Sequence, residues 1–236
     1  MKGTIAFTFI SLISFSAFAE NSIVIKQIGD NATIDIEQDG NSNVVKRWRS
    51  YDKGLDGDDN TLKIGQYKNA GSTSDKNVIE IRRVWGDDNQ LALGQGYAVT
   101  STGTMTKSTD DEYGDMDMHI NITGNGNDIS SSQTSSSNTT GHSFDLHLEG
   151  DDNKVHTRQK HGGGHHINLD IYNDDNDVTI EQKHGTGSHS THIILNGSAG
   201  TDVDLLQQGY TNQSYSLNQY CVTAAGCSVS VTQGNW

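Results

Sequence analysis

The sequence predicts an all-β fold, an amyloid-like β-solenoid of stacked strand-arc-strand coils with parallel, in-register Asn and Gln ladders. Three observations support it: a repeated frame of Asn, five residues and Gln, an alternation of apolar and polar residues within that frame, and the absence of proline. Because proline cannot donate a hydrogen bond to a strand ladder, a strand-rich chain without proline is permissive of stacking.

The amino-terminal residues 1–19 have the pattern of a secretory signal peptide. Lys2 supplies the positive charge, Ile5 to Ile13 form an apolar run, and Ala17-Phe18-Ala19 matches a small-x-small cleavage site. The run is too short to span a membrane, and no later segment is apolar enough to do so. We therefore expect a secreted, extracellular protein without a membrane span, whose residues 20–236 form a single repeat domain.

Eight glutamines close windows that begin with Asn in most copies. The period of two places the Asn, two apolar residues and the Gln on one face of a strand. A buried amide without a partner costs about 1–3 kcal/mol, but identical amides stacked along an axis satisfy one another. The predicted structural ladder comprises Asn21, Gln27, Gln38, Asn60, Gln66, Asn89, Gln95, Asn127, Gln133, Asn153, Gln159, Asn176, Gln182, Gln207 and Gln233.

From Gln66 onward the glutamines recur every 23 to 38 residues, a spacing typical of solenoids. Each window follows another alternating segment, such as Phe144-x-Leu146-x-Leu148. Gly/Asx stretches such as 57–60 join the two, and these residues tolerate left-handed backbone angles. The length varies mainly after the Gln, above all in 96–114, so we expect the insertions in return loops.

The net charge of −14 disfavours nucleic acid as a partner, because phosphate binding needs clustered Lys and Arg. Four aspartates recur in the arcs, namely Asp58, Asp87, Asp151 and Asp174. Oxygen-rich turns of this kind could hold a divalent cation such as calcium between coils. Solvated turns that keep the chain soluble are the other interpretation, and the one we favour. No further cofactor is expected.

Histidines cluster between residues 161 and 192, including His165, His166 and His189. A transition-metal column is one interpretation of this cluster, and solvated loop residues are the favoured one. The sequence contains no Ser-His-Asp pattern, phosphate-binding loop or His-Glu-x-x-His motif, and its carboxylates lie in repeated turns. We therefore predict that the protein is not an enzyme.

The two cysteines, Cys221 and Cys227, lie close together near the carboxyl end. In an oxidising compartment they can close a short loop, which would stabilise the fold by about 2 kcal/mol or less. Free stacked thiols are the alternative, because Cys227 stands in the Asn position of the last window.

The amino-terminal stretch carries a more specific pattern. In Asn21-SIVIK-Gln27-I-Gly29-DN-ATIDIE-Gln38-D-Gly40, Gln recurs after eleven residues and Gly follows each Gln by two. This pattern resembles the curlin repeat, whose units read Ser/Asn-x5-Gln-x-Gly-x4-Asn-x5-Gln. The units here are longer and less uniform, and Gln-Gly pairs recur at 208–209 and 233–234.

Curlins are exported subunits of curli, the amyloid fibres of the bacterial biofilm matrix. The resemblance implies a secreted structural subunit of a pilus-like fibre at the cell surface, for adhesion and biofilm matrix. It also implies self-assembly, with other curlin subunits, a nucleator and an outer-membrane secretion pore as partners. A monomeric β-solenoid adhesin or matrix protein, with or without calcium, is the alternative. It would need capped ends, whereas Gln windows open at Asn21 and close at Gln233.

Overall fold

The structure is a computed structural model that describes residues 21–40, 42–47, 54–68, 76–109, 115–135, 141–160, 164–183 and 188–234. Within these ranges the chain contains strands and no helix, and the strands of its large sheets pair in parallel. The all-β, parallel prediction is therefore confirmed. No helix among the described residues is long and apolar enough to cross a membrane. The predicted signal peptide, residues 1–19, lies outside the described ranges.

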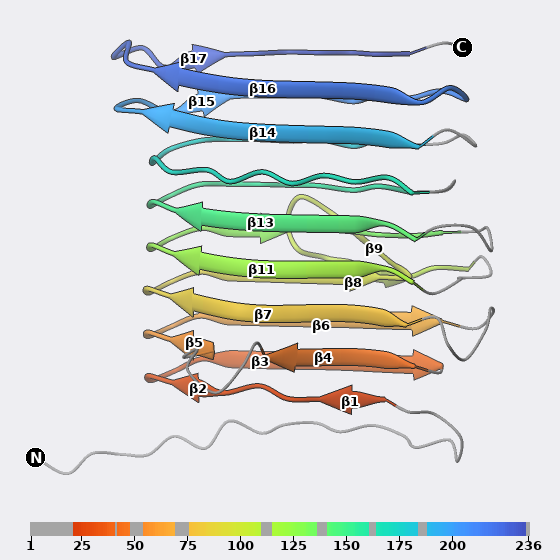
Figure 1. Cartoon of the computed structure of the whole chain (residues 1–236). Helices are drawn as coiled ribbons and strands as arrows, with labels where there is room; N and C mark the ends of the chain where they lie inside the picture. The colour runs from red at the N-terminus through yellow and green to blue at the C-terminus, as the bar shows by residue number, and fades with distance from the viewer. Residues whose placement is uncertain are drawn as a thin grey trace, which may run out of the picture.

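The strands form two sheets that run side by side along the molecule (Figure 1). The first sheet contains β1 (Ser22–Ile23), β2 (Gln27–Ile28), β4 (Asn43–Arg47), β5 (Gly54–Asp56), β7 (Asn77–Trp85), β11 (Asp117–Thr123), β13 (Ser143–Glu149), β14 (His189–Gly197) and β16 (Gln213–Cys221). The second contains β3 (Thr33–Gly40), β6 (Thr61–Lys68), β8 (Gln90–Gln95), β12 (Asp128–Ser130), β15 (Thr201–Asp202) and β17 (Cys227–Ser228).

Each strand pairs with the strand one repeat further along the chain. Ile34 of β3 is in register with Leu62 of β6, which in turn is in register with Leu91 of β8. Single bridges, such as Lys154 to Asp177, continue the same register where the chain is not a regular strand. We call one passage through the first sheet, the arc and the second sheet a layer, and Figure 1 shows the layers stacked from the amino to the carboxyl end.

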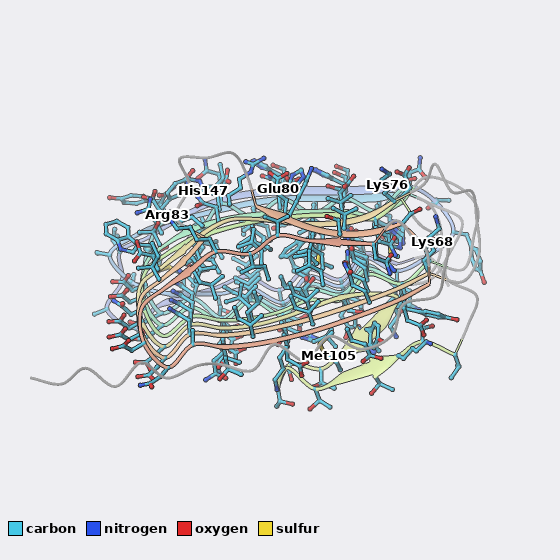
Figure 2. The ribbon with its side chains drawn as sticks, turned by 90° about the horizontal axis from the view of Figure 1, so that it is seen from below. Lys68, Lys76, Glu80, Arg83, Met105 and His147 are labelled. Carbon is cyan, nitrogen blue, oxygen red and sulfur yellow. A yellow bond between two sulfur atoms is a disulfide. The ribbon has the colours of Figure 1, made fainter. Side chains whose placement is uncertain are left out.

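The core lies between the two sheets, where alternate residues of each strand meet (Figure 2). In β11 and β13 the burial alternates residue by residue, so the period-two pattern of the sequence sets which side chains enter the core. Aliphatic columns result, such as Ile120, Leu146, Leu169 and Ile193, each at most 4% exposed. Each burial removes apolar surface from water and stabilises the fold by about 1.5–3 kcal/mol per large side chain.

The arcs between the sheets depend on left-handed backbone. Gly86 has a φ of 131° and Asp88 a φ of 58°. A Cβ atom on Gly86 would overlap the carbonyl oxygen of Gly124 in the next layer. Glycine is therefore required here both by the backbone angle and by the close approach of neighbouring layers.

Residues 96–114, expected as a return loop, contain an antiparallel hairpin of β9 (Tyr97–Val99) and β10 (Met105–Lys107). The hairpin packs on the outer side of the second sheet, as the position of Met105 in Figure 2 shows. Gly65 and Gly94 make room for it, because a Cβ atom at either position would overlap hairpin side chains. The insertion thus covers part of one sheet instead of extending into solvent.

Candidate functional site

A column of glutamine side chains runs along the second sheet. Gln66 Nε2 donates to Gln95 Oε1 at 2.8 Å, and Gln207 Nε2 donates to Gln182 Oε1 at 2.8 Å. The column consists of Gln38, Gln66, Gln95, Gln133, Gln159, Gln182, Gln207 and Gln233. Among the described residues, the step from Gln133 to Gln159 has no amide–amide hydrogen bond. There each Nε2 donates to a main-chain carbonyl of the first sheet instead.

The same glutamines connect the two sheets. Gln95 Nε2 lies 3.0 Å from Val78 O, in the first sheet, and 2.8 Å from Met116 O, directly before β11. Gln182 Nε2 donates to His166 O at 2.9 Å in the same way. A Glu could accept from its neighbour but could not donate to these carbonyls, which explains why the position takes an amide.

A parallel column of asparagines satisfies the main chain where each arc enters the second sheet. Asn89 donates through both its main-chain N–H, at 2.9 Å, and its Nδ2, at 3.1 Å, to Asn60 Oδ1. The pattern repeats through Asn127, Asn153 and Asn176. It ends at Thr201, whose main-chain N–H donates to Asn176 Oδ1 at 2.8 Å, and Cys227 is in register with Thr201.

The first window, from Asn21 to Gln27, lies outside these two columns. It runs through the first sheet, where Gln27 is in register with Leu55. Asn21 belongs to a different column, and its Oδ1 accepts the main-chain N–H of Asn43 at 3.0 Å. The reason is that first and second strands share the same alternation, so a polar residue followed by Gln six positions later can occur in either sheet.

The predicted aspartates of the arcs hydrogen-bond the main chain of the preceding layer. Asp87 Oδ1 accepts the N–H of Asp58 at 2.8 Å, and Asp174 Oδ1 accepts the N–H of Asp151 at 2.8 Å. The carboxylate of Asp58 accepts from Asp30 and that of Asp151 accepts from Asn125, so Asn125 stands where an Asp would be expected. One oxygen of each predicted ligand is thereby engaged, and calcium binding stays a prediction. Among the described residues, no group of three or more His, Cys, Asp or Glu side chains could hold a metal ion.

Cys221 and Cys227 form a disulfide in the structure, with their Cα atoms 5.9 Å apart. Cys221 is buried at the end of β16, and Cys227 begins β17. The bond therefore joins the two strands of the last layer across their arc.

The outer side of the first sheet carries a row of ion pairs. Glu80 lies 3.0 Å from Lys46 and 3.1 Å from Arg82. Burial raises the pKa of Glu80, but the hydrogen bonds from these two cations outweigh it and hold the pKa below its ordinary value. Lys46 thus pairs with Glu80 while its own side chain stays largely exposed.

In the next layers His119 Nδ1 is hydrogen-bonded to Asp145 Oδ1 at 2.9 Å. The other oxygen of Asp145 lies 3.7 Å from His166 Nε2. The hydrogen bond with Asp145 raises the pKa of His119, and the two imidazoles hold the pKa of Asp145 well below its usual range.

Three other histidines are buried, which the sequence did not indicate. His165 and His189 were expected to be solvated and are each 1% exposed, as is His142. Each lies two residues before the next inward residue of its strand. Asn43 and Asn77 occupy the same position in earlier layers. That offset is a signal that sequence analysis could have used. His161 and His184 lie outside the described residues.

The two ends of the stack leave strand edges unpaired. In the described residues β1 and β3 at the amino end, and β16 and β17 at the carboxyl end, each pair on one side only. Comparison of the chain with family models, with curated proteins and with solved structures finds no match.

Proposed function

We propose that the chain is a β-solenoid that serves as a secreted structural subunit of a curli-like functional amyloid fibre at the bacterial cell surface. In such a fibre the last layer of one copy pairs with the first layer of the next. The fibre would serve adhesion and the biofilm matrix. The observation that carries the proposal is the match between the two ends of the stack.

The match is seen residue by residue in the second sheet. The first layer presents Ile34, Ile36 and Gln38 at positions in register with Leu62, Ile64 and Gln66. The last layer presents Val229, Val231 and Gln233 at the equivalent positions, since Gln233 Nε2 donates to Gln207 Oε1 at 2.7 Å. These end residues are only half-buried, whereas their equivalents inside the stack are fully buried. A second copy in the same register would complete both the aliphatic columns and the glutamine column.

Charge also favours pairing at the carboxyl end. Asp204 is the last charged residue of the sequence, so the whole layer 213–233 is neutral although the chain carries −14. Soluble proteins commonly protect edge strands with Lys, proline or a bulge. The last layer contains no Lys or proline, so no charge repulsion opposes a second copy there.

The test is incubation of the purified mature chain, followed by thioflavin fluorescence and fibre diffraction. We expect fibres with a meridional spacing of about 4.8 Å. A chain that stays a soluble monomer for days would refute the proposal and favour the monomeric adhesin. A parallel incubation with EGTA tests whether the predicted cation takes part in assembly. If it does, its removal should change the rate of fibre formation.

A matched pair of variants tests the surface itself. Val231→Lys places a charge among the aliphatic columns at the carboxyl end, whereas Ser230→Lys places it on the exposed outer side of the same layer. We expect Val231→Lys to abolish or strongly slow assembly and Ser230→Lys to assemble at nearly the normal rate. Equal rates for the two variants would show that this end is not the assembly surface.

A further inference from the structure

A column of buried polar side chains along the start of the first sheet changes its chemistry halfway along the molecule. Asn43 is in register with Asn77, and Asn77 Nδ2 donates to Asn43 Oδ1 at 3.2 Å. After Met116 the same position is taken by His142, His165 and His189, each joined to its neighbours by the pairing of the residues that follow them. The column ends at Gln213, in register with His189.

The three imidazole rings stack face to face. The ring centroids of His142 and His165 are 4.8 Å apart with planes inclined by 8°, and those of His165 and His189 are 4.9 Å apart with planes inclined by 5°. Stacked rings cannot share one metal ion through nitrogens so far apart, because zinc–imidazole bonds are about 2.0–2.1 Å long. The geometry therefore favours a structural stack over a metal column.

One hydrogen bond of the stack requires a neutral ring, that of His165. His165 Nδ1 lies 3.3 Å from the main-chain N–H of His189, which can only donate, so this nitrogen must accept. His142 Nε2 lies 2.9 Å from Thr134 O and also contacts Lys160 O, which can only accept, so this nitrogen carries the proton. In this arrangement Nδ1 takes the role that Asn21 Oδ1 has toward Asn43. A proton added to His165 Nδ1 would place two donors against each other.

Among the described residues, the side chains that face the column from the second sheet carry no negative charge. The second-sheet residues facing the column are the neutral amides of Gln159, Gln182 and Gln207, followed by Lys160 and Lys183. The charged and titratable groups on the same strands lie on the outer side of the sheet, namely Asp117, His119, Asp145, His147, Glu149, His166 and His192.

His189 shows the consequence most directly. Among the described residues, neither of its ring nitrogens makes a well-formed hydrogen bond, although the main chain of Gly209 lies nearby. Burial lowers the pKa of His189, an effect that the main chain of Gly209 only partly offsets. Protonation of two adjacent rings would add repulsion between like charges.

We propose that the stacked imidazoles of His142, His165 and His189 are a proton-operated lock: neutral rings hold the layers of the carboxyl-terminal half together, and acid opens them. This lock acts within one molecule, so it goes beyond the proposed function and does not depend on fibre assembly. The direction of the pH dependence follows from the linkage between proton binding and folding. A folded pKa below the unfolded value makes the unfolded chain bind more protons, so stability is full at neutral pH and falls below about pH 6.5.

The test is native-state hydrogen exchange of the full mature chain at pH 7.5 and pH 5.0, expressed as protection factors under monomeric conditions. Between these pH values each histidine that cannot be protonated in the fold shifts the opening equilibrium up to about 30-fold. We expect protection of 141–160 and 188–207 to fall at least tenfold on acidification. Protection of 77–95, which contains no histidine, should change much less. Unchanged protection of 141–160 and 188–207 in the natural chain would overturn the proposal.

Variants separate the column from the other histidines. The triple change His142→Asn, His165→Asn and His189→Asn installs the residue that the earlier layers use and should abolish the acid response. The control, His166→Asn with His192→Asn, alters only the outer side and should retain it. An acid response that survives the triple change would refute the lock.

If the triple variant does not fold at pH 7.5, the reciprocal variant provides the test of the proposal. Asn43→His with Asn77→His moves stacked imidazoles into the amino-terminal half. We expect the protection of 77–95 to become acid-sensitive by tenfold or more, and a response no greater than that of the natural chain would count against the proposal.

Discussion

Replacement of Gln95 by Ala tests the central feature of the structure, the buried glutamine column. Gln95 is fully buried and accepts a hydrogen bond from Gln66 Nε2 at 2.8 Å. Its own Nε2 contacts Gln133 Oε1 at 3.1 Å as well as the carbonyls of Val78 and Met116. One side chain thus connects three consecutive layers and both sheets.

The magnitude follows from these contacts. The amide has two N–H groups, which are shared among three acceptors, and its oxygen accepts one hydrogen bond from Gln66. Truncation to Ala therefore removes about three hydrogen bonds. At about 1 kcal/mol each, and with buried acceptors left unsatisfied, the free energy of unfolding should fall by about 3–4 kcal/mol. Such a loss is a large part of the stability of a typical domain.

The assay is urea unfolding followed by far-UV circular dichroism, at a protein concentration low enough to keep the chain monomeric. The matched control is Gln90→Ala, because Gln90 lies on the same strand and is exposed. We expect a change within about 0.5 kcal/mol for Gln90→Ala. A loss below about 1 kcal/mol for Gln95→Ala, or equal losses for both variants, would refute the assignment of stability to the amide column.

Three further predictions concern the arc, the disulfide and the outer face. Gly86→Ala should lower the melting temperature, because the left-handed backbone at Gly86 costs about 1–3 kcal/mol for a residue with a Cβ atom, and an unchanged melting temperature would contradict the strain. Reduction of the Cys221–Cys227 bond should cost about 2 kcal/mol, measured by urea unfolding with and without dithiothreitol, and no difference would assign the bond no role in stability. Asp145→Asn should return the pKa of His119 toward about 6.5 in an NMR titration, and an unmoved pKa would contradict the pairing. Since the pKa of His119 is raised and that of Asp145 lowered, the natural pair stabilises the fold most between about pH 4 and pH 6.5.

Much of the site was accessible from the sequence because it rests on a strict local repeat. Seven of the eight predicted glutamine windows run through one sheet and form one column, and the register puts Thr201 and Cys227 in the asparagine position. The window at Asn21 runs through the other sheet, since alternation alone does not distinguish the two sheets. The roles of the arc aspartates toward the main chain were also missed, because a hydrogen bond between layers depends on which residues become neighbours along the stack.

The sequence by itself determined which residues form strands, which side chains point inward and where amides recur, because a period of two and a frame of seven residues are local properties. Only the tertiary structure decided that His142, His165 and His189 are buried in contact with one another, since their spacing along the chain is set by loops of unequal length. It also decided that the insertion after Gln95 folds back over Gly65 and Gly94. The physical reason is the same in both cases: a side chain in a stacked sheet has its main neighbours one layer away, and the pairing register selects those neighbours.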